Sequence, residues 1–219
     1  MKKAFTLSEV LVTLSIISVI AVLTVPSIVK NYRYKMYSTQ LQKTYSQIQT
    51  AIKTVMEDEM TNDFYQTTAG AKDDFTNCSK GVCYFINKYF KLARKNCGNS
   101  TKKCVADSYI SITGENAGYI TSNSFKPYCA QTINGAAICM THNPANHVSS
   151  IFLDINATDP PNTIGLDAFV MSFSSDGQLR DWHNDPEKCN TKQNSYGHIA
   201  DYASGCLYKV INNGWVIKD

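Results

Sequence analysis

The chain has 219 residues, 43% of them hydrophobic, and a formal net charge of +3. This length allows one sizeable core, or a core with an extended element attached to it. The charge is too small and too dispersed to indicate nucleic acid as a main partner, and no stretch is rich enough in Pro, Gly or like charges to be a disordered tail.

A long hydrophobic run occupies the start of the chain. It extends from Phe5 to Val29 and carries a single charge, on Glu9. Because the core of a bilayer requires about 20 apolar residues in a helix, the run is long enough to span a membrane. Lys2 and Lys3 precede it. They predict a cytoplasmic N-terminus, with the rest of the chain on the opposite side of the membrane.

A secretory signal peptide and an ordinary single-pass anchor are the alternatives for this run. A signal peptide needs small residues at a cleavage site after the apolar run, and the basic, aromatic sequence KNYRYKMY follows instead. An ordinary anchor does not explain Glu9. A carboxylate in hydrocarbon costs at least about 2–3 kcal/mol, so that it is expected to have a partner.

The N-terminal sequence KKAFTLSEV resembles the prepilin cleavage and methylation motif of type IV pilins and type II secretion pseudopilins. The resemblance implies that a membrane peptidase cuts between Ala4 and Phe5 and methylates the new amino terminus on Phe5. It also implies an assembly role for Glu9 and a helix-bending role for Pro26. Two residues depart from the family's pattern, because Ala4 stands where Gly is usual and Ser8 where a larger apolar residue is usual.

The same resemblance implies an α+β, type IV pilin-like fold, in which a long hydrophobic N-terminal helix packs on a head with a small antiparallel β-sheet. The expected parts are a leader (1–4), a transmembrane and filament-core helix (5–29), an amphipathic continuation of that helix (30–60) and a disulfide-containing head (61–219). The subunit is expected in the inner membrane before assembly, and in a periplasmic or cell-surface filament afterwards.

The function that the resemblance implies is structural. The chain would be a subunit of a type IV pilus, as a minor pilin, or a type II secretion pseudopilin. Its partners would be other pilin subunits, the prepilin peptidase, the inner-membrane assembly platform and the membrane. A membrane-tethered extracytoplasmic binding domain or enzyme is the alternative from a different class.

Glu9 has a physical role in this interpretation. Its carboxylate pairs with the positive amino terminus of Phe5 on a neighbouring subunit. Because either charge alone is costly in a medium of low dielectric constant, the pair favours docking and sets the axial register of the subunits.

Beyond residue 30, apolar side chains recur every three or four positions with polar residues between them, which predicts an amphipathic helix that continues the hydrophobic one. A helix from Phe5 to about Met60 would be roughly 80 Å long. Pro26 removes one intrahelical hydrogen bond and is expected to bend this helix or to open a short melted stretch. The apolar stripe consists of Tyr34, Tyr37, Leu41, Tyr45, Ile48, Ile52 and Val55.

In the rest of the chain, short apolar segments alternate with turn residues, which predicts an antiparallel sheet. A loop at 133–135 would place Cys129 opposite Cys139, so that a cross-strand disulfide is expected there. Two further hairpins are predicted, one around 175–177 and one around 212–214.

The chain contains eight cysteines, all of them after the hydrophobic run. An even number in this position is typical of an oxidising, non-cytoplasmic location, and the chain has no C-x-x-C pair of the kind that binds zinc. We expect neighbouring cysteines to pair, although the spacing leaves other connectivities open. The expected pairs besides Cys129–Cys139 are Cys97–Cys104, Cys189–Cys206 and, by elimination, Cys78–Cys83. The loop closed by Cys189–Cys206 is similar to the C-terminal disulfide-bounded loop of many pilins.

Oxygen-bearing side chains gather around two prolines in the segment LDINATDPPNTIGLDAF. Such spacing suits calcium, and some pseudopilins bind calcium in their heads. The pattern is not that of an EF-hand, and Asp and Asn beside prolines are ordinary turn formers, so that a structural turn is the alternative. The candidate calcium ligands are Asp154, Asn156, Asp159, Asn162 and Asp167. No other cofactor is predicted.

Catalytic motifs are missing from the sequence. It contains no G-x-S-x-G, no H-E-x-x-H and no phosphate-binding glycine loop, and we predict no enzyme activity. The histidines are scattered and are expected on the surface or in loops. They are His142, His147, His183 and His198.

Overall fold

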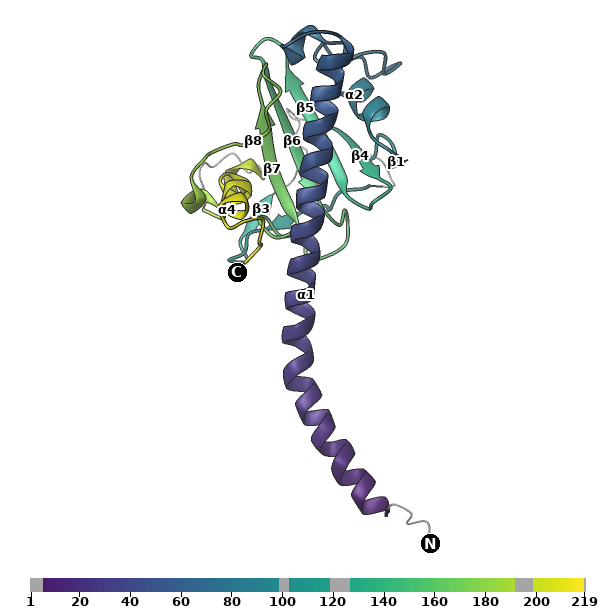
Figure 1. The fold of residues 1–219 in the computed structure, drawn as a ribbon, viewed down its shortest axis with the longest axis vertical. Coiled ribbons are helices and arrows are strands. Elements are labelled where there is room, and N and C mark those ends of the chain that lie inside the picture. Colours follow the sequence, from purple (N-terminus) through teal and green to yellow (C-terminus); the bar gives the residue numbers. More distant parts are fainter. Residues whose placement is uncertain (1–5, 99–102, 119–126, 192–198, 219) are drawn as a thin grey trace.

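A computed structural model describes residues 6–98, 103–118, 127–191 and 199–218, without the side chains of Ala200 and Asp201. Its longest element is helix α1, Leu7–Asp58. The N-terminal half of α1 extends away from the rest of the chain, and the C-terminal half lies across a β-sheet (Figure 1). The single long helix expected from the sequence is therefore confirmed.

Helix α1 remains helical on both sides of Pro26 and curves over its N-terminal half (Figure 1). The proline ring lacks the N–H that would donate to the carbonyl of Val22, and its bulk pushes the preceding turn aside. The helix is continuous through Pro26, so that the melted stretch is absent, and a bend at this residue stays a prediction.

The head contains a six-stranded antiparallel sheet with the strand order β1-β4-β5-β6-β7-β8. A separate two-stranded sheet pairs β2 with β3. The α+β class is confirmed, with a main sheet larger than the small one expected. The strands are β1 (Leu92–Arg94), β2 (Tyr109–Ile110), β3 (Asn116–Gly118), β4 (Tyr128–Thr132), β5 (Ala137–Asn143), β6 (Val148–Asp154), β7 (Ala168–Phe173) and β8 (Arg180–Asp181).

Two of the three predicted hairpins are present. Strands β4 and β5 pair in the register that places Cys129 opposite Cys139. Strands β7 and β8 flank the turn at 175–177 and pair Met171 with Asp181.

The third predicted hairpin, around 212–214, is wrong. Residues 206–212 form helix α4 (Cys206–Asn212) instead of a strand. Helical spacing puts the buried side chains of Cys206, Leu207 and Val210 on one face, which packs against β7 and β8. A strand would have divided those three residues between two faces. The tertiary contact therefore decides the conformation of a segment whose own sequence is ambiguous.

Short helices in the head were also missed by the sequence analysis. In α2, the apolar residues Val82, Cys83, Phe85 and Ile86 are buried with helical spacing, a signal that was present in the sequence. The short helices are η1 (Phe64–Gln66), α2 (Gly81–Tyr89), η2 (Pro186–Lys188), α3 (Ala200–Ala203) and α4.

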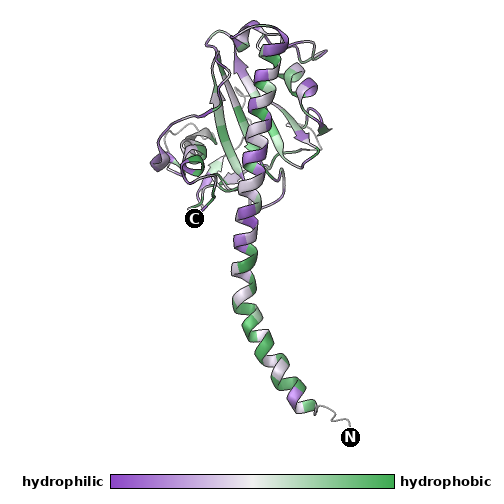
Figure 2. Cartoon of the chain, in the orientation of Figure 1, coloured by the Kyte–Doolittle hydropathy of each residue, from purple (hydrophilic) through white to green (hydrophobic). Residues whose placement is uncertain are grey.

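The core lies between α1 and the sheet. The predicted stripe of α1 faces it, with Leu41, Ile48, Ile52 and Val55 fully buried and Tyr37 nearly so. Figure 2 shows the hydrophobic strands behind the C-terminal half of the helix. The amphipathic half of α1 is therefore part of the head's own core.

The turn between β7 and β8 is attached to α1 by side chains of the helix. Gln49 Nε2 donates to the carbonyl of Gly177 (2.8 Å), and Gln49 Oε1 accepts from the Leu179 N–H (2.9 Å). Gly177 has a φ of +65°, and a Cβ at this position would lie 2.7 Å from Ile52 Cγ2 and from Met56 Sδ. Only glycine allows the turn to approach the helix so closely.

The cysteines pair as expected from the sequence. The disulfides are Cys78–Cys83, Cys97–Cys104, Cys129–Cys139 and Cys189–Cys206, and no free cysteine remains.

The expectation that the histidines lie on the surface or in loops is wrong for His142. This side chain belongs to β5 and is fully buried, with Nε2 2.7 Å from the Ala71 carbonyl oxygen. The His142 side chain therefore has a structural role, in the packing between the sheet and the segment before α2. His198 lies outside the described residues.

Candidate functional site: the N-terminal half of helix α1

Apolar side chains cover the N-terminal half of α1 and have no partner within the described chain. Large hydrophobic residues from Leu7 (78% exposed) to Val29 (41% exposed) face outward. Among the described residues, α1 is the one helix long and apolar enough to cross a membrane, and none of its most apolar window is buried. Signal sequences and soluble core helices can pass the same test of length and composition. The core helix of a soluble protein is mostly buried, which this segment is not within the described chain.

Four hydroxyl groups inside this apolar segment donate hydrogen bonds to the carbonyls of the helix itself. Thr13, Ser15 and Ser18 donate to the carbonyls of Glu9, Leu11 and Leu14 respectively, at 2.7–3.0 Å. Thr24 donates to the Ile20 carbonyl (2.9 Å). In hydrocarbon a polar group must find its partner within the protein, so these internal bonds make the segment compatible with a membrane.

Glu9 lies in the first turn of α1 and closes a capping box with Thr6. Its Oε2 accepts from the Thr6 N–H (2.8 Å) and from the Thr6 hydroxyl (2.7 Å), and the Glu9 N–H donates to Thr6 Oγ1 (3.3 Å). The carboxylate is exposed and has no cation beside it among the described residues. Within the described part of one subunit, the hydrogen bonding of Glu9 is therefore satisfied and its charge has no compensating cation.

A comparison with protein families identifies this end of the chain. The model of one family, described as the prokaryotic N-terminal methylation motif, matches residues 1–25. The chain is type IV pilin-like. The matched motif and the exposed apolar helix support a membrane-anchored filament subunit of the type IV pilin or pseudopilin kind. A search of curated proteins and a search of solved structures found no match.

The structure describes only part of the predicted processing and assembly site. Ala4 and Phe5 lie outside the described residues. Glu9 and Pro26 both lie in the exposed half of α1, Glu9 in its first turn and Pro26 inside the helix.

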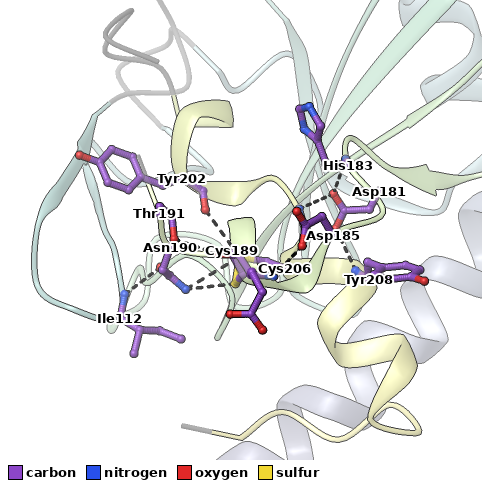
Figure 3. Close-up of a disulfide and its surroundings, with 12 residues drawn as sticks. Ile112, Asp181, His183, Asp185, Cys189, Asn190, Thr191, Tyr202, Cys206 and Tyr208 are labelled. Atoms are coloured by element: carbon purple, nitrogen blue, oxygen red, sulfur yellow. Dashed lines mark hydrogen bonds between the residues drawn. A yellow bond between two sulfur atoms is a disulfide. The ribbon is translucent and has the colours of Figure 1, made fainter. Parts of the chain in front are cut away.

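The C-terminal disulfide of this pilin-like chain is organised by a buried acid that the sequence analysis missed. Asp181, on β8, accepts from the Gly205 N–H (2.7 Å), the Tyr208 N–H (2.9 Å) and the His183 N–H (3.1 Å). Figure 3 shows it between the disulfide loop and α4. Burial raises the pKa of Asp181, and the three N–H donors oppose that shift.

A second side chain connects the disulfide loop to the small sheet. Asn190, beside Cys189, accepts from the Ile112 N–H through Oδ1 (2.9 Å), as Figure 3 shows. No periodic signal in the sequence marks Asp181 or Asn190, because their partners are distant backbone groups.

The five predicted calcium ligands do not all come together. Asp154 and Asp167 are fully buried, whereas Asp159 is exposed. Asp154 accepts from the Tyr109 hydroxyl (2.5 Å), and Asp167 accepts from the N–H groups of Thr163 (2.6 Å) and Asn162 (2.9 Å). The structure thus supports the alternative of an ordered turn. Within the described ranges, no three His, Cys, Asp or Glu side chains are gathered as metal ligands.

Two features of this cluster nevertheless suit a cation. Burial raises the pKa of Asp167 to about 6, and burial together with the nearby charge of Asp167 raises the pKa of Asp154 well above its usual value. The side-chain oxygens of Asn156 and Asn162 are buried and lack a hydrogen-bond partner among the described residues. Buried carboxylates beside unpartnered amide oxygens are the kind of ligand set that calcium prefers.

Proposed function

We propose that this chain is a minor pilin of a type IV pilus, assembled through α1 after the prepilin peptidase removes residues 1–4. The observation that carries the proposal is the exposed apolar half of α1, most of which coincides with the matched methylation motif. Only a membrane or a bundle of similar helices can cover such a surface. The length of the chain and the presence of Glu9 favour a minor subunit other than a tip-capping one that lacks this glutamate.

The proposed assembly proceeds in three steps. The peptidase cuts between Ala4 and Phe5 and methylates Phe5. An inner-membrane assembly platform then extracts the subunit, and Glu9 meets the amino terminus of a neighbour's Phe5. Finally, the apolar halves of several α1 helices pack together. In the membrane, Lys2 and Lys3 favour a cytoplasmic N-terminus, and the disulfides of the head suit the oxidising side.

A type II secretion pseudopilin is the alternative within the same kind of protein. A membrane-tethered binding domain or enzyme is the alternative from another class. It would need a pocket in the head with convergent titratable groups, and the matched motif points instead to a structural subunit.

Mass spectrometry of the mature N-terminus, followed by proteomics of sheared surface filaments, tests the proposal. We expect a chain that begins with N-methylated Phe5 and is present in the filaments in a small proportion. An intact Met1, or a cut after Val29, would contradict processing by the prepilin peptidase. Recovery of a processed chain only in a secretion-dependent periplasmic filament would favour the pseudopilin.

Calcium in the head is a further part of the proposal. We propose that the carboxylates of Asp154 and Asp167 and the amide oxygens of Asn156 and Asn162 hold the ion, without the exposed Asp159. A bound calcium ion would supply the positive charge that two buried carboxylates lack.

The stability of the chain, measured against pH without calcium and against calcium at pH 7, checks this calcium site. Without calcium, folded Asp167 binds its proton up to about pH 6, whereas its usual pKa is 3.8. The folded state therefore binds more protons than the unfolded state between these values, and we expect the free energy of unfolding to fall by about 2–3 kcal/mol as the pH rises through this window. At pH 7, calcium at about 100-fold its Kd is expected to raise the Tm by at least about 5 °C.

The test variant for this measurement is Asp154→Asn, which removes the negative charge of a proposed ligand, and its matched control is Asp107→Asn, which removes the charge of an exposed acid elsewhere. Only Asp154→Asn is expected to abolish the calcium effect. If millimolar calcium leaves the Tm of the wild-type chain unchanged at pH 7, the calcium proposal is wrong and the cluster is a structural turn.

A further inference from the structure

A groove of about 800 Å³ lies between α1 and the segment that joins α2 to β1. Side chains from residues 43–54 of α1 line one wall, and side chains from residues 88–91 and 132–134 line the other. Figure 1 shows α2, β1 and β4 on this side of α1 and α4 on the opposite side. Apolar side chains are accessible in the groove, among them Ile133, which is 60% exposed.

Hydrogen bonds hold the second wall of the groove against α1. At one end, Gln40 Nε2 donates to the Asn134 carbonyl (3.2 Å). At the other end, the Tyr89 hydroxyl donates to Asp58 Oδ2 (3.1 Å), so that one carboxylate lies at this end of the groove. The groove is therefore a fixed feature of the fold.

Three exposed lysines line the groove, and no carboxylate side chain does. The side chains of Lys43 and Lys91 make no hydrogen bond or ion pair with the described part of the chain. Lys88 Nζ donates to the Tyr84 hydroxyl (2.7 Å) and lies 5.1 Å from the centroids of the Tyr84 and Tyr89 rings, which are neutral groups. Three positive charges therefore stand against the one carboxylate at the end of the groove.

Two acids of the sequence have no described side chain, Asp201 and Asp219. Asp219 follows Lys218, which lines a separate hollow between α1 and residues 214–218. Asp201 belongs to α3, which contacts β7, whereas the groove lies beside β1 and β4 at the other edge of the sheet. Neither of the described segments next to these acids lines the groove.

The head end of α1 has the opposite chemistry, and we call residues 57–60 the acidic tip. Glu57 and Asp58 are exposed, and Met60 is 95% exposed with a φ of +52°. The last turn of α1 contains no basic residue. Acids at the C-terminal end of a helix oppose its dipole, so that these charges cost stability unless a cation meets them. The tip therefore combines unfavourably placed carboxylates with an exposed, flexible apolar side chain.

The groove and the acidic tip lie at different heights along α1. The middle of the α1 wall and the middle of the tip are about nine residues apart, which is about 14 Å along the helix axis. Two copies with parallel helices can therefore join tip to groove only if one copy is displaced along the axis. The proposed pairing of Glu9 with the Phe5 of a neighbour requires a displacement in the same direction, because it sets residue 9 of one helix level with residue 5 of the next.

We propose that in the filament the groove binds the acidic tip of a second copy of this chain. The lysines of the groove pair with Glu57 and Asp58 of the second copy, and its Met60 packs against Ile133 and Phe90. Because groove and tip are different surfaces, each contact leaves a groove free on one copy and a tip free on the other, and the contact can repeat in one direction. This inference rests on the proposed filament. It adds that copies of this chain lie next to one another there, in a short run, instead of singly among other subunits.

Sedimentation equilibrium of the full chain in neutral detergent micelles measures this contact. The wild-type chain is expected to self-associate. The pair of substitutions Lys43→Glu and Lys91→Glu is expected to weaken the association at least about tenfold, because it sets acids against the acidic tip. The matched control, Lys72→Glu with Lys95→Glu, makes the same change of charge at exposed lysines outside the groove and is expected to associate as the wild type does.

An exchange of charges tests the identity of the occupant. Adding Glu57→Lys and Asp58→Lys to the groove variant gives an acidic groove and a basic tip, and the association is expected to return to within about threefold of the wild type. Damage to the fold by the first two substitutions would not be reversed by the second two. Any association through the apolar halves of α1 is common to all the variants.

Three results would overturn the proposal. In the first, the groove variant and its control associate equally. In the second, the exchange of charges does not restore association. In the third, the groove variant associates as the wild type does but is lost from sheared filaments, which assigns the groove to a different acidic subunit.

Mass spectrometry of the N-terminus in the same preparations separates these failures from that of the proposed function. A wild-type chain that begins with methylated Phe5 and enters filaments, but gives one of the three results, loses only the contact between copies. A wild-type chain with an intact Met1 loses the proposed function as well.

Discussion

Replacing Glu9 with alanine is expected to leave the chain in the membrane but to reduce its recovery in sheared filaments at least about tenfold. The reason is the unpaired charge. Without the carboxylate, the amino terminus of a neighbouring subunit enters the apolar bundle alone, and breaking a buried ion pair in this way typically costs about 3–5 kcal/mol. Immunoblots of membrane and filament fractions measure the two quantities separately.

The capping box makes a sharper version of this experiment possible. Glu9→Gln keeps a side-chain oxygen that can accept from the Thr6 N–H but removes the charge. Thr6→Ala removes the side-chain cap and keeps the charge. If the charge is what matters, Glu9→Gln fails to assemble and Thr6→Ala assembles. Normal incorporation of Glu9→Gln would show that Glu9 serves only to begin the helix.

Replacing Ile48 with alanine is expected to destabilise the head by about 2–5 kcal/mol, the usual cost of a cavity left by a large aliphatic side chain. Ile48 is fully buried between α1 and the sheet. Urea unfolding of the full chain in micelles, with the disulfides intact, measures the loss.

Gln47→Ala is the matched control for the Ile48 experiment, because Gln47 is the exposed neighbour of Ile48 on the same helix. Its effect is expected to stay within about 0.5 kcal/mol. Equal effects of the two substitutions would mean that α1 is not packed on the sheet in solution.

Features with a local cause were predictable from the sequence. The helical spacing from Tyr37 to Val55 predicts which face of α1 is buried, because one face of a helix repeats every three to four residues. The register of β4 and β5 follows from the turn between them, which places Cys129 opposite Cys139. Neither prediction needed knowledge of distant parts of the chain.

Features that depend on distant partners were missed or only half predicted. The sequence of residues 206–212 is compatible with a strand or a helix, and these residues are helical because that conformation packs against β7 and β8. Asp181 is an ordinary strand residue in the sequence, and it organises the C-terminal loop only because Gly205 and Tyr208 fold back onto it. Of the five oxygen-bearing residues that the sequence predicts as calcium ligands, the fold buries the Asp154 and Asp167 carboxylates and leaves Asp159 exposed.

The sequence by itself determined the character of the first thirty residues and the long helix that contains them, because hydrophobicity, a short basic leader and a lone glutamate are properties of the chain alone. The tertiary structure decided what surrounds that helix. Residues 214–218 come to lie beside Lys30 and Lys35 only because Ile217 and Trp215 bind to α1, and a hollow between distant segments has no signature in either segment alone.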